Sequence, residues 1–367
     1  MNLGEVLGPR LEGARKIAVL RANAIGDFIC TVPALEALRA AYPRAELTLL
    51  GQPWHAGFLG GRPGPWDRVI AVPQSEGVYV PRGGVQEDEA ELDAFFSRMR
   101  AEQFDLAVQL HGGGRFSNPF VQRLGARFTV GLRAPDAPDL DRSLPYVFAQ
   151  HEVVRGLEVV SLVGAQPVTL TPGIAVTAAD LAESRAVLRG NGVPEDDCPL
   201  VVLHPGAGDP RRRWSPAKFA AVGDDLSSRG ARVVVTGAPE EAEVVGEVME
   251  RMRRPALNLC GKLSLGGLAG LLSRRALLIS NDSGPMHLGA AVGARTVGIY
   301  WCLNFANWAI LTRARHRPLV SWQIDCPICG VDCIKGKCEH SASLVDAVTV
   351  EEVLAAALDL LDSKSAS

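Results

Sequence analysis

Residues 281–287, Asn-Asp-Ser-Gly-Pro-Met-His, lie just after the apolar run 276–279 and could bind a phosphate. Aliphatic residues followed by Asp-Ser-Gly predict a buried strand, a tight turn and a helix that begins near Pro285, since proline is tolerated in the first turn of a helix and Ser and Asp are good N-caps. This junction would direct unpaired backbone N–H groups and the positive end of a helix dipole at one point, which favours an anion. An ordinary strand-to-helix connection is the alternative for this stretch taken alone.

A second stretch, residues 204–214, has the sequence His-Pro-Gly-Ala-Gly-Asp-Pro-Arg-Arg-Arg-Trp and also follows a predicted strand. Arginine is always charged and binds phosphate oxygens through a planar fork. Glycines such as Gly206 make the turn beside the arginines flexible. Charge runs are usually solvated loops. The position of this run after a core strand, opposite the turn at Asp282, instead favours a diphosphate-binding loop that includes Arg212 and Arg213.

A third stretch, residues 21–29, follows the first predicted strand and contains Asn23, Gly26 and Asp27. Gly26 permits a close turn, and Asp27 would lie near the start of the following helix. A carboxylate at that place could simply cap the helix. It would also lie at the carboxyl end of a strand, where ligands bind in open α/β sheets and where a base could accept a hydroxyl proton. Both roles are open for Asp27 at this point.

His111 follows another predicted strand, which ends at Leu110, and we expect it on the acceptor side of such a site together with Arg115. The alternative is a structural role, which is the usual one for a lone histidine at a strand end. Other motifs are excluded. The glycines at 112–114 and 206–208 lack the spacing of a dinucleotide fingerprint, and no P-loop motif occurs.

Four cysteines, Cys326, Cys329, Cys333 and Cys338, lie within thirteen positions, with His340 nearby. Four thiols at this spacing could surround a tetrahedral zinc ion with a structural rather than a catalytic role. Only one close pair is present, so the spacing fits a zinc knuckle less well than two paired Cys-x-x-Cys motifs would. A reduced thiol-rich loop and disulfides formed on purification are the alternatives.

Strand-like and helix-like segments alternate along the chain, and the alternation starts twice. Strand-like segments that are separated by helix-like segments predict a parallel, doubly wound α/β sheet in each half. Residues 136–145, which are polar and contain prolines, are predicted to form a loop. The predicted strands span residues 16–21, 46–50, 69–72 and 104–110 in the first half and 199–203, 231–236, 277–280 and 296–300 in the second.

We therefore expect three segments: an N-terminal domain over residues 1–170, a second domain over 171–340, and a final segment over 341–367 whose helix packs back on the first domain. Two similar open α/β domains that face one another would place a ligand cleft between their strand ends. A hydrophobic content of 47% in 367 residues is ample for two packed cores.

The net charge of the chain and the length of its apolar runs limit the kinds of partner that we expect. A net charge of −3 gives no general attraction for nucleic acid, so any anion site must be local. No apolar run reaches the ~20 residues that a membrane span needs, and the first residues lack the apolar core of a signal peptide. We expect a cytoplasmic protein with mostly reduced cysteines that contacts at most the inner face of the cytoplasmic membrane.

Taken together, these junctions resemble those of glycosyltransferase family 9, whose best-known members are the ADP-heptose:lipopolysaccharide heptosyltransferases. The resemblance spans nearly the whole chain. It implies a GT-B architecture, in which two Rossmann-like doubly wound domains face each other across a cleft, the first holding the acceptor and the second the nucleotide sugar. The matching motifs are residues 20–27 running into 31–35, 110–112, 204–207, 212–214 and 281–291.

The resemblance also implies roles for single residues. Asp27 matches the family's proposed catalytic base, and Arg212 falls where members often carry a phosphate-binding lysine, so the charge is kept but its geometry changes. Pro285 lacks an N–H, so one donor available in other members is absent. Glu240 or Glu241 occupies the region expected to meet the nucleoside ribose. The diphosphate-binding turn corresponds to Asp282, Ser283, Gly284 and Pro285, followed by His287.

We therefore predict an inverting, metal-independent glycosyltransferase that moves a sugar, heptose from ADP-heptose in the family's commonest case, to a hydroxyl of a lipopolysaccharide-core or related glycan acceptor. No cofactor is required, and a zinc ion in the cysteine cluster would be structural. One alternative is a nucleotide-sugar epimerase or hydrolase on the same scaffold, which would consume the donor without an acceptor. Another is a non-catalytic metal- or redox-responsive protein that uses the cysteine cluster.

Overall fold

The computed structural model describes residues 8–81, 83–194, 198–336 and 338–362. Residues 1–7 of the expected first domain and 363–367 of the expected final segment therefore lie outside the described residues. The chain divides into two compact units, Met1–Pro172 and Gly173–Ser367. The division falls two residues after the boundary expected at residue 170.

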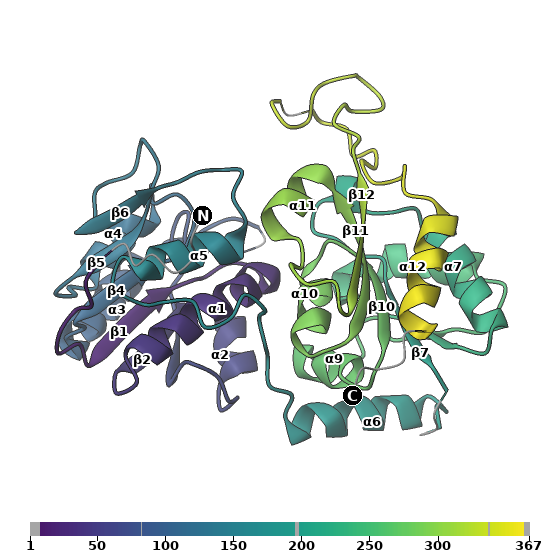
Figure 1. Cartoon of the computed structure of the whole chain (residues 1–367), viewed down its shortest axis with the longest axis horizontal. Coiled ribbons are helices and arrows are strands. Elements are labelled where there is room, and N and C mark those ends of the chain that lie inside the picture. Colours follow the sequence, from purple (N-terminus) through teal and green to yellow (C-terminus); the bar gives the residue numbers. More distant parts are fainter. Residues whose placement is uncertain (1–7, 82, 195–197, 337, 363–367) are drawn as a thin grey trace. The chain divides into compact units, whose positions relative to one another are not determined.

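The first unit is built on a six-stranded sheet with the order β3-β2-β1-β4-β5-β6 (Figure 1). Every neighbouring pair of strands is parallel. The strand order reverses between β1 and β4, so the carboxyl ends of these two strands form the topological switch point at which open α/β sheets bind ligands. The strands are β1 (Lys16–Leu20), β2 (Glu46–Gly51), β3 (Arg68–Ala71), β4 (Leu106–Gln109), β5 (Thr129–Arg133) and β6 (Arg142–Pro145).

Among the described residues of the first unit, five helices accompany this sheet. In α1, the side chains from Phe28 to Leu35 are buried, and the helix packs against α5. Phe95 and Phe96 of α3 and Phe120 of α4 form an apolar cluster with Leu20 of β1. The helices are α1 (Ile25–Ala41), α2 (Pro53–Leu59), α3 (Glu89–Glu102), α4 (Ser117–Arg123) and α5 (Glu152–Ser161).

The second unit repeats this plan with the strand order β12-β11-β10-β7-β8-β9. Counted from its own first strand, β7, the order is the same as in the first unit, and all pairs are again parallel. The predicted α/β class with two doubly wound sheets is thus confirmed. The strands are β7 (Leu200–His204), β8 (Arg232–Val235), β9 (Leu257–Asn258), β10 (Leu277–Asn281), β11 (Arg295–Trp301) and β12 (His316–Ser321).

The helices of the second unit begin with α6, which follows the division between the units. Two short 3₁₀ turns, η1 (Pro210–Arg212) and η2 (Pro239–Glu241), follow β7 and β8. Among the helices of the described residues, none has both the length and the apolar character that crossing a bilayer requires. The helices are α6 (Ala178–Gly190), α7 (Pro216–Ser228), α8 (Ala242–Arg251), α9 (Leu265–Leu272), α10 (Gly284–Ala291), α11 (Cys302–Trp308) and α12 (Val350–Asp362).

Two details differ from the sequence-based expectations. Residues 136–145 do not form a loop throughout, because Arg142–Pro145 pair with β5 as the edge strand β6. The final helix, α12, buries Val353, Ala357 and Leu360 in the core of the second unit, against α7 and strands β10–β12. Its apolar face is therefore used within the second unit and not, as expected, on the N-terminal domain.

Candidate functional site

The chemistry-bearing stretches of the second unit meet where its strand order reverses. β7 ends at His204 and β10 ends at Asn281, and the two strands are neighbours, with Ser280 opposite His204. The loop after β7 and the turn after β10 therefore leave the same edge of the sheet side by side. This is the switch point of the second sheet, where a ligand is expected.

The side chain of Asn281 holds both ends of the arginine-bearing loop. Its amide Nδ2 donates to the carbonyl of Pro205 over 2.7 Å, and its Oδ1 accepts from the backbone N–H of Trp214 over 3.0 Å. Asn281 is fully buried. One amide group thus closes the eight residues between these contacts, 206–213, into a loop. We call these residues the arginine loop.

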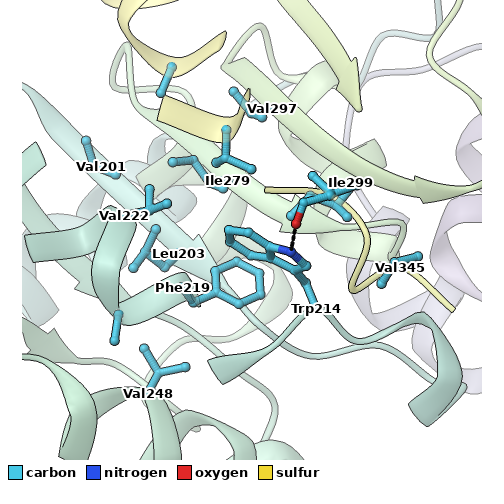
Figure 2. Packing of buried hydrophobic residues seen from close by; sticks show 14 of the residues in the cluster. Val201, Leu203, Trp214, Phe219, Val222, Val248, Ile279, Val297, Ile299 and Val345 are labelled. Carbon is cyan, nitrogen blue, oxygen red and sulfur yellow. Dashed lines mark hydrogen bonds between the residues drawn. The ribbon is translucent and has the colours of Figure 1, made fainter. Parts of the chain in front are cut away.

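Trp214 anchors the end of the arginine loop in the core. Its ring lies edge-on to Phe219, with centroids 5.1 Å apart, among the strand residues Leu203 and Ile279 (Figure 2). The indole Nε1–H donates to the carbonyl of Val348 over 2.8 Å, so the buried polar atom is satisfied. This contact also ties the loop to the start of the C-terminal helical segment.

The three arginines of the loop have different partners. Arg211 pairs with Asp209 over 2.7 Å, and Arg213 donates from Nε to the carbonyl of Ala207 over 3.0 Å. Arg212 alone reaches the neighbouring turn, where its Nη1 lies 3.1 Å from Oδ2 of Asp282. About a quarter of the Arg212 side chain is exposed. Since a guanidinium carries five N–H groups, this pair leaves donors for an anion.

Asp282 is a buried carboxylate with several partners. Oδ2 accepts from Asn304 over 2.7 Å as well as from Arg212, and Oδ1 lies 3.4 Å from Nε2 of His287. Burial alone would raise the pKa of Asp282, but the hydrogen bond and charge of His287, the charge of Arg212 and the Asn304 amide lower it below its ordinary value. Asp282 is thus a fixed negative charge that orients Arg212, and it is not exposed to bind a diphosphate itself.

The turn after Asp282 ends in the N-terminus of α10. Ser283 is the N-cap residue, and its hydroxyl lies 3.1 Å from that of Ser280. Ser283, Gly284 and Pro285 are half-exposed. The first N–H groups of a helix have no partner within the helix, so the N–H groups here and the helix dipole favour an anion beside Arg212.

The expected ribose-binding region contacts the arginine loop at Gly206. Oε2 of Glu241 lies 3.6 Å from Nε2 of His204 and accepts from the backbone N–H of Ala238 over 2.8 Å. A Cβ placed on Gly206 would fall 1.9 Å from Oε1 of Glu241, so a larger residue there would displace the Glu241 carboxylate. Glu241 is therefore held at the loop, whereas Glu240 is exposed.

In the first unit, the switch point carries a charged network around Arg21. Its guanidinium donates to Glu152 over 3.0 Å, to Asp27 over 3.3 Å and to the carbonyl of Leu110. Glu152 also pairs with Arg155, and all of these side chains are buried except that of Asp27, which is about a quarter exposed. Asp27 lies in the first turn of α1. The network presents one partly exposed carboxylate at the end of β1.

His111 is fixed by two backbone contacts. Its Nδ1 accepts from the N–H of Ala22 over 3.1 Å, and its Nε2 lies 3.1 Å from the carbonyl of Gly77. Burial, together with the charge of Arg21, lowers the pKa of His111 to about 3. The imidazole is therefore neutral and engaged at both nitrogens, a geometry that suits positioning of the β1 loop and not proton transfer.

The remaining acceptor-side candidates lie around this network. Asn23 and Gly26 precede Asp27 on the same turn, and Oδ1 of Asn23 is buried without a hydrogen-bond partner among the described residues. Arg115 is two-thirds exposed and lies 3.6 Å from Asp136. The first unit thus brings Asn23, Gly26 and Asp27 together, with Arg115 on a separate loop after β4.

The cysteine segment between β12 and α12 forms a group that differs from the expected one. Ligand atoms of Cys326, Cys329, Cys338 and His340 all lie within 4.8 Å of one another, and Cys333 is not among them. Hydrogen bonds from the N–H groups of Cys329 and Ile328 lower the pKa of the Cys326 thiol to about 6. Three thiols and one imidazole are a donor set that suits a tetrahedral metal ion.

Two residues that sequence reasoning missed matter most for this geometry, Asn281 and Glu152. Asn281 is the first residue of the motif 281–287, and the motif gives no sign that its side chain closes a neighbouring loop. Glu152 lies 131 positions from Arg21, and no local pattern in the sequence indicates that the two residues pair. Arg21 stood in a motif, but its burial could not be foreseen from the sequence.

Comparison with solved structures shows the fold class of this protein. It is similar to the glycosyltransferase family 9 protein from Veillonella parvula DSM 2008, with a TM-score of 0.78, 22% identity and coverage of 99% of this chain and 100% of that one. It is also similar to the E. coli heptosyltransferase WaaC with ADP-2-deoxy-2-fluoro heptose, with a TM-score of 0.58, 19% identity and coverage of 92% and 97%. The chain therefore has a GT-B-like fold.

Sequence comparison then gives the family. A family model described as glycosyltransferase family 9 (heptosyltransferase) matches residues 92–319, more than half of the chain. The lipopolysaccharide heptosyltransferase 3 of Escherichia coli is 24% identical over 291 residues, which cover 77% of this chain and 82% of that protein. The chain belongs to glycosyltransferase family 9 and is a glycosyltransferase, so the non-catalytic alternative is set aside.

We predict that Asp282→Asn lowers the free energy of unfolding by about 3 kcal/mol near neutral pH, because it leaves buried donors without a charged partner. Since the folded-state pKa of Asp282 lies below its ordinary value, its contribution is complete above about pH 5 and is lost progressively as the pH falls further. Urea unfolding of the wild type and of Asp282→Asn from neutral to acidic pH should show a difference in the free energy of unfolding that narrows only in acid.

The matched control is Asp359→Asn, which removes a carboxylate from the exposed pair with Arg317. This change should cost at most about 1 kcal/mol. An Asp282→Asn protein as stable as the wild type near neutral pH would contradict the assigned role of this carboxylate.

Proposed function

We propose that this chain is an inverting, metal-independent heptosyltransferase that moves heptose from ADP-heptose to a hydroxyl of a lipopolysaccharide-core acceptor at the inner face of the cytoplasmic membrane. The observation that carries the proposal is Arg212, which is held by Asp282 beside the N-terminus of α10 at the switch point of the second unit. The name of the E. coli relative and the ADP-heptose analogue in the WaaC structure support the choice of sugar and nucleotide.

In this proposal the second unit binds the donor. The diphosphate accepts hydrogen bonds from Arg212 and from the N–H groups of Ser283 and Gly284, and the ribose lies near Glu240 and Glu241. Charge develops on the diphosphate as the bond to the anomeric carbon breaks. A fixed guanidinium and a helix N-terminus stabilise that charge, and so fill the role that Mg²⁺ has in metal-dependent transferases.

The first unit supplies the base. As the acceptor oxygen forms its bond to the anomeric carbon, on the face opposite the departing diphosphate, the hydroxyl proton passes to Asp27. Arg21 orients the Asp27 carboxylate through the hydrogen bond between them, and the Glu152 carboxylate forms an ion pair with the same guanidinium. Asp27 therefore keeps a defined direction and some exposure to the acceptor.

Binding of nucleotides tests the donor site. We expect calorimetric titration without added metal to show that ADP binds more tightly than UDP or GDP. Arg212→Ala should weaken ADP binding by about 10- to 100-fold, because a hydrogen bond to a charged group contributes ~1.5–3 kcal/mol. Arg211→Ala is the control, since Arg211 pairs with Asp209, and its Kd for ADP should stay close to that of the wild type.

Equal weakening by the two arginine variants would indicate general electrostatics and not a specific contact. Selectivity for UDP or GDP would remove ADP-heptose as the donor, and no binding of any nucleotide would contradict the donor site.

Transfer kinetics test the base. We expect Asp27→Asn to lower kcat by about 10²- to 10⁴-fold, the usual contribution of a general base, with little change in ADP affinity. The control is Glu36→Gln, which makes the same chemical change further along α1 and should leave kcat unaltered. Transfer by the Asp27→Asn protein at nearly the wild-type rate would reject this role.

A further inference from the structure

The segment between β12 and α12 lacks a hydrophobic core of its own. Figure 1 shows that much of it extends away from the sheet of the second unit. Several of its large apolar side chains are exposed, including Trp322 at 72% and Ile328 at 63%. Apart from Leu344, Val345 and Val348, which lie in the core of the second unit, the described part of this segment buries little apolar surface. It therefore needs another source of order, which disulfides and metal ions commonly supply.

The backbone around the first two cysteines forms a turn closed by two hydrogen bonds. The N–H of Gly330 donates to the carbonyl of Cys326 over 2.9 Å, and the N–H of Cys326 donates to the carbonyl of Val331 over 2.8 Å. Gly330 has φ +71°, a conformation that favours glycine. The N–H groups of Ile328 and Cys329 donate to the sulfur of Cys326.

Cys338 and His340, which follow Cys329 by nine and eleven positions, return to this turn. With Cys326 and Cys329 they place four ligand atoms within 4.8 Å of one another, and Cys329 is exposed, so an ion can reach the group. Cys333 is not one of these four residues: its thiol contacts that of Cys338, but its side chain also packs against the hydrophobic core of the second unit. The fold thus selects three of the four clustered cysteines and adds a histidine.

We propose that Cys326, Cys329, Cys338 and His340 bind one tetrahedral divalent ion with a preference for sulfur and nitrogen ligands, Zn²⁺ or Fe²⁺, and that this ion positions the arginine loop. A Cys₃His set is closed, because all four positions of a tetrahedron are occupied by protein atoms, and so the ion is structural. It takes no part in the transfer reaction.

The connection to the arginine loop runs through the residues that follow His340. The hydroxyl of Ser343 donates to the carbonyl of Arg213 over 2.7 Å, and the N–H of Leu344 donates to the carbonyl of Arg211 over 2.7 Å. The hydroxyl of Ser321 in β12 donates in turn to the carbonyl of Leu344 over 2.6 Å. An ion bound to His340, three residues before Ser343, therefore restrains Ser343 and Leu344, which hydrogen-bond to the arginine loop.

Metal analysis and cobalt spectroscopy test the site. Protein purified under reducing conditions without chelator should carry one Zn²⁺ or Fe²⁺ per chain, and replacement by Co²⁺ should give the visible bands of a tetrahedral thiolate complex. Cys329→Ser and Cys338→Ser should lose the metal and these bands. Cys333→Ser is the matched control and should retain both, because Cys333 is outside the group.

Loss of metal from Cys333→Ser as complete as that from Cys329→Ser would overturn the ligand set. Failure of the reduced wild type to take up Zn²⁺, Fe²⁺ or Co²⁺ would overturn the site itself.

The positioning role rests on the proposed donor function and has a separate measurement. Apoprotein prepared by chelation under reducing conditions should bind ADP at least about fivefold more weakly than the metal-loaded protein, a coupling typical of linked sites, and adding back the ion should restore the affinity. Equal ADP affinity with and without the ion would overturn this role. If the metal-loaded protein binds no ADP, the donor function fails, while the metal stoichiometry still decides the site.

Discussion

The candidate donor site depends on one buried amide, that of Asn281. Its two hydrogen bonds, to Pro205 and Trp214, close the arginine loop, and leaving either partner unpaired would cost about 1–3 kcal/mol. The next residue, Asp282, then fixes the direction of Arg212. Two consecutive residues at the end of β10, Asn281 and Asp282, thus determine the position of the arginine loop, which follows β7. They can reach this loop because the strand order makes β10 and β7 neighbours.

The two units use the same topology with opposite charges. In the first, a buried cation, Arg21, is balanced by Glu152 and holds a partly exposed carboxylate, Asp27. In the second, a buried carboxylate, Asp282, holds a partly exposed cation, Arg212. Each buried charge is paired, as burial requires, and each exposed partner has the charge that its proposed role needs: a base for the acceptor and a cation for the diphosphate.

The sequence predicted the fold well where burial is continuous. Parallel strands covered on both faces appear as apolar runs, as in β7 and β10. It failed for β6, since the edge strand Arg142–Pro145 carries no apolar run and its extended form comes from pairing with β5. Motifs located most candidate residues, but contacts such as Arg21–Glu152 span 131 positions. The group of possible metal ligands contains His340 and not Cys333. This choice depends on side-chain directions, which the spacing of the residues does not give.

Acceptor-dependent, inverting transfer is tested most directly by product analysis of the reaction with ADP-heptose, without added divalent metal, in the presence and absence of a lipopolysaccharide-core acceptor. We expect ADP to be released only when the acceptor is present, in equal amount to a glycosylated product whose anomeric configuration is inverted relative to the donor. Release of ADP and free heptose without acceptor would indicate a hydrolase, and retention of configuration would contradict direct attack assisted by Asp27.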